Sequence, residues 1–167
     1  DNRAFLPLTD EIIKNHLMGV DPREPSDRDF TIGVYPLLPD DTSSFLAVDF
    51  DKASWMEDVS AFLATCNSYD VPVALERSRS GNGGHVWIFF SEPIPALLSR
   101  KMGSFLLTET MELRPEIGLD SYDRFFPNQD RLPKGGFGNL IALPLQKKPR
   151  KKGKTGRDDE DYHGKMA

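Results

Sequence analysis

Apolar and polar residues alternate in blocks that predict three helices and a set of short strands. Apolar residues at helical spacing predict helices over 9–19, 52–69 and 93–113. Short apolar runs bounded by Pro, Gly or Asp predict strands, which fall at 30–38, 43–50, 71–76, 85–90 and 135–146, with a further short extended segment within 114–130. The resulting order predicts an α/β (α+β) sandwich on a mainly antiparallel sheet. The first two strands are expected to pair as a hairpin.

Local signals mark the ends and the buried faces of the predicted helices. Thr9 is expected to cap the first helix, and Ser54 with Glu57 three residues later predicts a capping box on the second. His16 is expected to be an ordinary histidine on a helix surface. Cys66 lies in the apolar stripe of the second helix, so we expect a buried small side chain rather than a nucleophile.

Two aspartates close the most apolar strand, in the sequence FLAVDFDK of residues 45–52. Residues two apart on a strand point to the same face, so Asp49 and Asp51 are expected to face the same side while Phe50 enters the core. Two carboxylates placed together repel each other unless cations lie between them. The pattern favours a site for two divalent ions with oxygen ligands. The alternative is a strand that runs into a polar loop.

A polar, glycine-rich segment, RSRSGNGG at 77–84, separates the next two strands. Its glycines leave backbone N–H groups accessible, and its side chains add donors that suit a triphosphate. It lacks the pattern of a P-loop. The residues predicted to bind nucleotide are Arg77, Arg79, Ser80, Asn82, Gly84 and His85, joined by Lys52 next to the aspartate pair. The alternative is a hairpin turn with a histidine at the sheet edge.

Composition adds limits on the class of protein. The chain has 21 basic and 26 acidic residues and a net charge of −5, so its surface as a whole does not indicate nucleic-acid binding. A single cysteine excludes an internal disulfide framework, and no apolar run is long enough to span a membrane, so a cytoplasmic location is expected. The chain begins with Asp1 rather than Met and is expected to be a piece of something longer. Residues 147–167 are expected to be a disordered charged tail or a truncated domain boundary, with a nucleic-acid contact by the basic residues as the minority interpretation.

Together these motifs resemble the archaeo-eukaryotic primase superfamily of primase-polymerases. Within it the chain resembles most closely the primase domain of TOTE conflict systems and of CRISPR-associated primase-polymerases. The matching stretches are GVYPLL (33–38), LAVDFDK (46–52), ALERSRSGNGGHVWIFF (74–90) and SYDRFFPNQDRLPKGGFGNLIALPLQ (121–146). The resemblance implies a catalytic core with an RNA-recognition-motif-like (RRM-like) fold, packed against a smaller N-terminal α/β unit, in a catalytic domain spanning 1–146.

The resemblance also implies an activity, which is template-directed joining of nucleoside triphosphates on a single-stranded DNA template and primer. Two Mg²⁺ or Mn²⁺ ions would be held by Asp49, Asp51 and a third acid. Asp130 is preferred over Asp123 for this role, because relatives place their acid four residues before a Gly-Gly-aromatic strand. A helicase or a CRISPR-associated domain is an expected partner in the same protein or operon, and no membrane is expected.

Two other functions stay open at this point. A metal-dependent nuclease would use the same carboxylates on water, although the sequence offers no additional His or Glu cluster to act as its base. A non-catalytic single-strand-binding module would use aromatic residues on an open sheet. Trp87, Phe89 and Phe90 are, however, expected to be core and strand residues.

Overall fold

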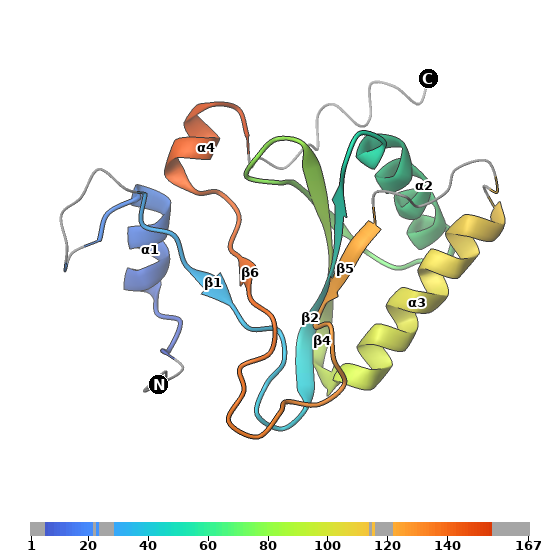
Figure 1. The fold of residues 1–167 in the computed structure, drawn as a ribbon, viewed down its shortest axis with the longest axis horizontal. Coiled ribbons are helices and arrows are strands. Elements are labelled where there is room, and N and C mark those ends of the chain that lie inside the picture. Colours follow the sequence, from blue (N-terminus) through green and yellow to red (C-terminus); the bar gives the residue numbers. More distant parts are fainter. Residues whose placement is uncertain (1–5, 22, 24–28, 114, 116–121, 155–167) are drawn as a thin grey trace.

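A four-stranded antiparallel sheet with two helices on one face forms the centre of the computed structural model (Figure 1). The structure describes residues 6–21, 23, 29–113, 115 and 122–154. The strand order is β3-β4-β2-β5, and the strands are β2 (Thr42–Asp51), β3 (Ala74–Arg77), β4 (Gly83–Pro95) and β5 (Tyr122–Phe126). The covering helices are α2 (Trp55–Ser68) and α3 (Ala96–Leu113). This arrangement confirms the predicted mixed α/β class with a mainly antiparallel sheet.

Strand β2 is central because both of its edges are paired and both of its faces are covered in part. Its alternate residues Leu46, Val48 and Phe50 are fully buried in the core between the sheet and the helices. The intervening residues face the opposite side of the sheet, where Ala47 packs in a second, smaller apolar cluster. Asp49 therefore faces away from α2 and α3.

The helix side of the sheet holds the main core. Side chains of α2 and α3 such as Phe62 and Leu106 pack against the apolar residues of β2 and β4. Cys66 is fully buried among them, and burial raises the pKa of its thiol to about 12. The full burial of Cys66 confirms the prediction of a buried small side chain.

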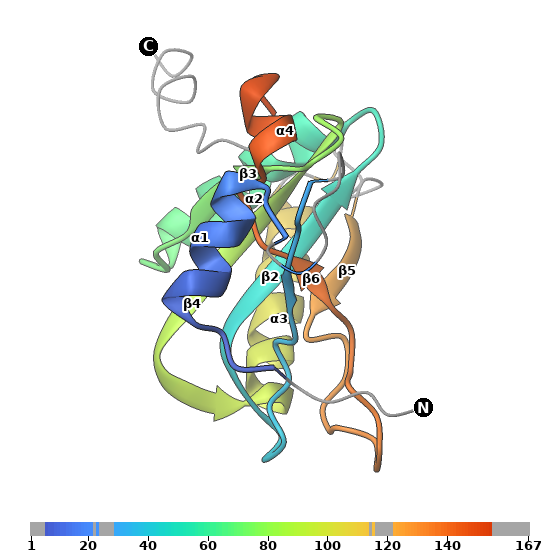
Figure 2. The ribbon, with the colours of Figure 1, turned by 90° about the vertical axis from the view of Figure 1, so that its left-hand side faces the viewer.

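A second unit lies on the other face of the sheet (Figure 2) and is built from both ends of the described chain. It comprises α1 (Asp10–Met18), β1 (Gly33–Val34), β6 (Ile141–Ala142) and α4 (Lys147–Lys151). Strands β1 and β6 pair with each other in an antiparallel ladder. The predicted cap is confirmed, since the Thr9 hydroxyl accepts the amide of Ile12.

His16 of α1 fastens this unit together and is only 1% exposed, so the prediction of a surface histidine is wrong. Its Nδ1 accepts the amide of Ile32 at 3.2 Å. Because that nitrogen accepts, the proton of the neutral ring is on Nε2, which donates to the carbonyl oxygen of Pro144 at 2.8 Å. The pattern of apolar residues along one helix did not indicate that two distant loops would cover the His16 side chain.

The predicted hairpin between 30–38 and 43–50 is also wrong. The first segment keeps only two strand residues, and they pair with β6, while β2 pairs with β4 and β5. Longer ladders to β4 and β5 occupy both edges of β2 and leave none for β1. The predicted strand over 135–146 likewise shrinks to β6.

Two helix starts differ from the sequence interpretation. The third helix begins at Ala96 because β4 continues through Pro95. The capping box on α2 does not form, since the hydroxyl of Ser54 donates to the carboxylate of Asp58 at 3.2 Å and makes no side-chain cap hydrogen bond.

Part of the predicted disordered tail is a helix, because α4 packs into the second unit. The backbone amide of Lys148 donates to Asp29 at 2.7 Å, and the Arg150 guanidinium donates to the carbonyl of Leu17 at 3.0 Å. Pro149 is buried. The expectation of disorder is therefore wrong for 147–151, while a domain boundary near 146 stays a prediction.

Within the described ranges, no helix has both the length and the apolarity needed to cross a lipid bilayer.

Candidate active site

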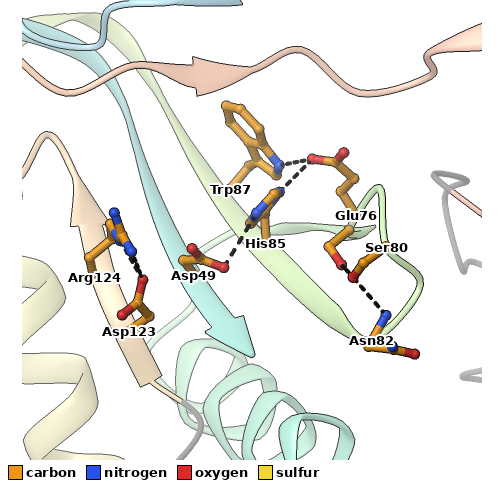
Figure 3. Close-up of polar contacts among 9 residues, drawn as sticks. Asp49, Glu76, Ser80, Asn82, His85, Trp87, Asp123 and Arg124 are labelled. Atoms are coloured by element: carbon orange, nitrogen blue, oxygen red, sulfur yellow. Dashed lines mark hydrogen bonds and ion pairs between the residues drawn. The ribbon is translucent and has the colours of Figure 1, made fainter. Parts of the chain in front are cut away.

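Asp49 and His85 lie directly opposite each other on β2 and β4, on the face away from the helices (Figure 3). Directly opposed residues of an antiparallel pair have side chains within contact distance, and here His85 Nε2 lies 3.4 Å from Asp49 Oδ1. Their side chains are 17% and 19% exposed, respectively. The structure thus brings together the first acid and the histidine that the sequence analysis placed in one site.

Glu76 of β3 completes a line of three polar side chains and was missed in the sequence analysis. Its carboxylate oxygen Oε2 lies 3.0 Å from His85 Nδ1 and also accepts the indole N–H of Trp87 at 3.0 Å. Glu76 is opposite His85 in the β3–β4 ladder. The sequence did contain a signal for Glu76, which is the acid that ends the apolar segment VPVALE. A hairpin around the glycine-rich loop pairs this position with His85.

These neighbours set the charge of His85. Burial by itself lowers the pKa of the imidazole, but hydrogen bonds to Asp49 and Glu76 and their negative charges outweigh burial and raise the pKa of His85 to about 9. The ring is therefore a cation at neutral pH. With both nitrogens protonated, it can donate through Nδ1 to Glu76 and through Nε2 toward an anion beside Asp49.

A bulge in β5 brings a further acid to the same face. Arg124 is opposite Asp49 and Tyr122 is opposite Phe50, so Asp123 is an extra residue on β5. The rings of Tyr122 and Phe125 both pack on the helix side, with centroids 5.3 Å apart. The two residues between them therefore project toward the Asp49 side, as a bulge allows. Asp123 forms an ion pair with Arg124 next to Asp49 (Figure 3).

Asp130 does not join this cluster, so the preferred placement of the third acid is not supported by the geometry. It forms an ion pair with Arg100 near the start of α3. The backbone of Leu132 donates to Asp41 at 2.7 Å, which places this segment at the beginning of β2. Asp49 lies seven residues after Thr42 on that strand, roughly 24 Å from its first residue at about 3.4 Å per residue. Spacing to a Gly-Gly pair could not reveal this separation, because 135–140 is not a strand.

The loop of residues 78–82 is closed by its own polar groups. The Ser78 amide donates to the Gly83 carbonyl at 2.8 Å, and the Ser80 hydroxyl accepts the amide of Asn82 at 3.1 Å. The Arg77 guanidinium donates to the Gly81 carbonyl at 3.1 Å. These contacts give the loop a defined shape beside His85. Arg79 and Asn82 are exposed on it.

Gly84 lies inside β4 rather than in the loop, where the sequence analysis had placed it. A Cβ at this position would lie 3.0 Å from the Trp55 ring, and one at Gly83 would lie 2.6 Å from the carbonyl oxygen of Phe50. Both glycines are therefore needed for close packing around the end of β2. The start of α2 can approach the strand only because these residues lack side chains.

The remaining predicted residues lie around the end of β2. Asp51 is exposed and pairs with Gly83. The next residue, Lys52, has a φ of 75° that turns the chain into α2. Together with Trp55 and Asn82, Lys52 lines a hollow of about 410 Å³ beside the strand end.

Comparison with known families connects this arrangement to a chemistry. Residues 1–163 match the family described as the archaeo-eukaryotic primase domain of TOTE conflict systems. The chain belongs to this family. Membership indicates a primase-like nucleotidyltransferase, and the resemblance noted from the motifs is confirmed. A search of curated proteins found no significant match.

The acids of the primase domain have the chemistry of a site for hard divalent ions. Asp49, Asp51 and Asp123 offer carboxylate oxygens, which Mg²⁺ and Mn²⁺ prefer over nitrogen and sulfur. Among the described residues, no three His, Cys, Asp or Glu side chains already converge as a metal site. Asp49 instead faces His85, and Asp123 pairs with Arg124. The donor set fits the ions, and side-chain rotation would be needed to assemble it.

Aromatic residues extend the same face of the primase domain away from the acids. Phe89 is 63% exposed, so its predicted place in the core is wrong, whereas Trp87 is buried as expected. The two rings stack with centroids 6.1 Å apart and planes 8° from parallel. With Phe45 and Leu143 they line an apolar pocket of about 370 Å³ that also reaches Glu76.

Proposed function

We propose that this primase domain joins nucleoside triphosphates on a single-stranded DNA template, with two Mg²⁺ or Mn²⁺ ions. The observation that carries the proposal is the direct opposition of Asp49 and His85, with an acid added from β5 by the bulge. Carboxylates able to hold cations and an imidazolium able to bind phosphate thus lie side by side on three strands. Phosphoryl transfer needs this combination of positioned charge and little other covalent chemistry from the protein.

In this proposal, Asp49, Asp51 and Asp123 hold the ions. Bound there, the ions would lower the pKa of the attacking 3′-hydroxyl and neutralise charge on the triphosphate. Asp123 takes the role first given to Asp130, because only Asp123 is on the strand beside Asp49. When the ions bind, we expect the ion pair between Arg124 and Asp123 to break. The carboxylate of Asp123 would then bind the cations and the guanidinium of Arg124 would bind phosphate.

His85 binds the triphosphate through Nε2–H. Because Glu76 accepts from Nδ1, the ring is held in one orientation and keeps its positive charge at neutral pH. The loop with Ser80 leads into β4 two residues before His85, and its backbone and hydroxyl groups, with Arg77 and Arg79, are proposed to bind the same triphosphate. Lys52 and Asn82, which line the hollow at the end of β2, are proposed to contact the incoming nucleotide.

Primer extension tests the assignment. The purified chain is incubated with a labelled primer–template, Mn²⁺ and either ribo- or deoxynucleoside triphosphates. We expect longer products from the wild type and none from Asp49→Asn, while Asp40→Asn, an acid at the opposite end of β2, extends normally. Normal extension by Asp49→Asn would refute the metal assignment. Shorter products from the wild type would instead support the nuclease alternative.

A single-strand-binding module is the second candidate, and the exposure of Phe89 over Trp87 favours it. Base stacking on such rings is worth about 1–3 kcal/mol per base. In that case, binding of an oligonucleotide would be unchanged by EDTA and weakened by Phe89→Ala, and no primer would be extended. A helicase or CRISPR-associated partner and a cytoplasmic location stay predictions.

A further inference from the structure

Positive charge is concentrated in one short segment of an otherwise acidic chain. Six of the eight residues from 147 to 154 are Lys or Arg and none is acidic, while the remainder has 15 basic and 26 acidic residues. The segment contains α4 and the turn that follows it. A local cluster of this kind gives a positive potential that the net charge of −5 conceals.

The basic segment touches the loop assigned to the triphosphate. Both ribbon views show α4 beside the turn between β3 and β4 (Figures 1 and 2). The ammonium of Lys154 donates to the carbonyl oxygen of Ser80 at 2.8 Å. The aliphatic part of Lys154 lies so close to Gly81 that a Cβ there would be 3.2 Å from it. The segment is therefore continuous with the candidate active site.

Some residues of the basic segment hold α4 against the second unit, whereas other lysines of the segment are exposed to solvent. Pro149 is buried, and Arg150 donates to the Leu17 carbonyl. Lys151 and Lys152 are exposed. A firmly held helix with exposed ammonium groups presents charge at fixed positions, which costs less entropy on binding than a mobile tail would.

We propose that α4 and Lys154 bind the sugar–phosphate backbone of the single strand that enters the candidate active site. The proposal deepens the proposed function, because it places the nucleic acid beside that site. Binding through phosphates is independent of base sequence and falls steeply with salt, since each neutralised phosphate releases condensed counterions. Lys154 lies between the two surfaces, where a strand would pass from α4 to the loop with Ser80.

The expected loss is set by the number of cations removed. For a single strand, each phosphate contact contributes a slope of about −0.7 to the dependence of log affinity on log salt. Lys151→Gln with Lys152→Gln should therefore make the slope less steep by about 1.4 and weaken binding roughly tenfold at 0.15 M salt. Neutral glutamines keep the helix, because their helix propensity is close to that of lysine.

The test is fluorescence anisotropy with a labelled single-stranded oligonucleotide from 50 to 200 mM salt, in EDTA and without nucleotide. The matched control is Lys101→Gln with Lys134→Gln, which removes two exposed cations at the opposite end of β2. We expect the control to bind as the wild type does and the α4 variant to show the stated loss. Equal affinities and slopes for the two variants would overturn the proposal.

A second arm tests another source of phosphate. Vesicles of phosphatidylcholine with phosphatidylserine are offered to the same proteins, and binding to these vesicles with no binding to the oligonucleotide would overturn the proposal. The binding experiments test this proposal independently of the proposed function, which is tested by primer extension. A wild type that binds oligonucleotide through α4 without extending primers would support this inference and refute only the polymerase assignment.

Discussion

Replacing Glu76 with glutamine tests how the candidate active site controls its histidine. The Glu76 side chain is 8% exposed, and its carboxylate faces both His85 and the indole N–H of Trp87. Glutamine has the same shape and retains an oxygen for Trp87. The substitution therefore removes the charge beside His85 while changing the packing little.

The magnitude follows from the pKa of His85. Its rise from 6.5 to about 9 corresponds to about 3 kcal/mol of preference for the charged ring. A neighbouring opposite charge contributes about 1–3 pKa units, and burial of the ring acts in the other direction. With Asp49 alone remaining, the pKa of His85 in Glu76→Gln should fall by about 1–3 units.

Stability should change with pH accordingly. Because the folded-state pKa is raised, the protonated ring stabilises the fold fully below pH 6.5, and this contribution is lost as pH rises through about 9. The free energy of unfolding of the metal-free wild type should therefore decrease across this window by up to about 3 kcal/mol. In Glu76→Gln the decrease should be smaller and should end at a lower pH.

The assay combines NMR titration of His85 in EDTA with urea unfolding at a series of pH values. Glu92→Gln, an exposed glutamate of the same strand as His85, is the matched control. If the pKa of His85 is the same in Glu76→Gln and Glu92→Gln, the explanation given for its charge is refuted. A nucleotide KM that rises in Glu76→Gln at pH 8 but recovers at pH 6 would add the functional consequence.

Three further changes test the site and the fold. Asp123→Asn should abolish Mn²⁺-dependent primer extension whereas Asp130→Asn should preserve it, and equal rates in the two variants would contradict the third-acid proposal. His16→Leu should lower the free energy of unfolding by about 2–4 kcal/mol in urea denaturation, because it leaves the amide of Ile32 and the carbonyl of Pro144 without their partner in a partly buried setting; an unchanged midpoint would contradict the contacts described. Gly84→Ala should cost about 1–3 kcal/mol in thermal unfolding, because its methyl group would press on the Trp55 ring; a variant as stable as the wild type would show that the strand can yield there.

Sequence patterns predicted correctly those elements that are defined by residues close together in the chain. Helical periodicity located α1, α2 and α3, and the apolar run before Asp49 located β2. The resemblance to primase-polymerases placed Asp49 and His85 in one site, whereas the pairing of their strands was not predicted. The helices and β2 depend on residues within one element, which a sequence presents directly.

Features that depend on distant segments could not be read in this way. The partner of β1 is more than 100 residues away in the chain, and no local pattern distinguishes it from β2. The bulge that turns Asp123 to the same face as Asp49 depends on how Tyr122 and Phe125 pack beneath the sheet. His16 became buried because the loops before β1 and after β6 close over it, which its helical position did not indicate.

The pairing of β1 with β6 has a mechanical consequence. The second unit is joined to the main sheet by two covalent connections, residues 35–41 and 127–140, and the hydrogen bond from Leu132 to Asp41 holds them together at the start of β2. A rotation of one unit against the other would therefore pivot at that end. Lys154 and Ser80 lie at the opposite end of the sheet, about 20–25 Å from this pivot. A rotation of about 5° about the pivot would therefore displace that end by about 2 Å. The ammonium–carbonyl contact between Lys154 and Ser80 therefore lies where such a rotation would displace the two units most, beyond the apolar cluster of Ala47, Trp87 and Ile141 that packs them together.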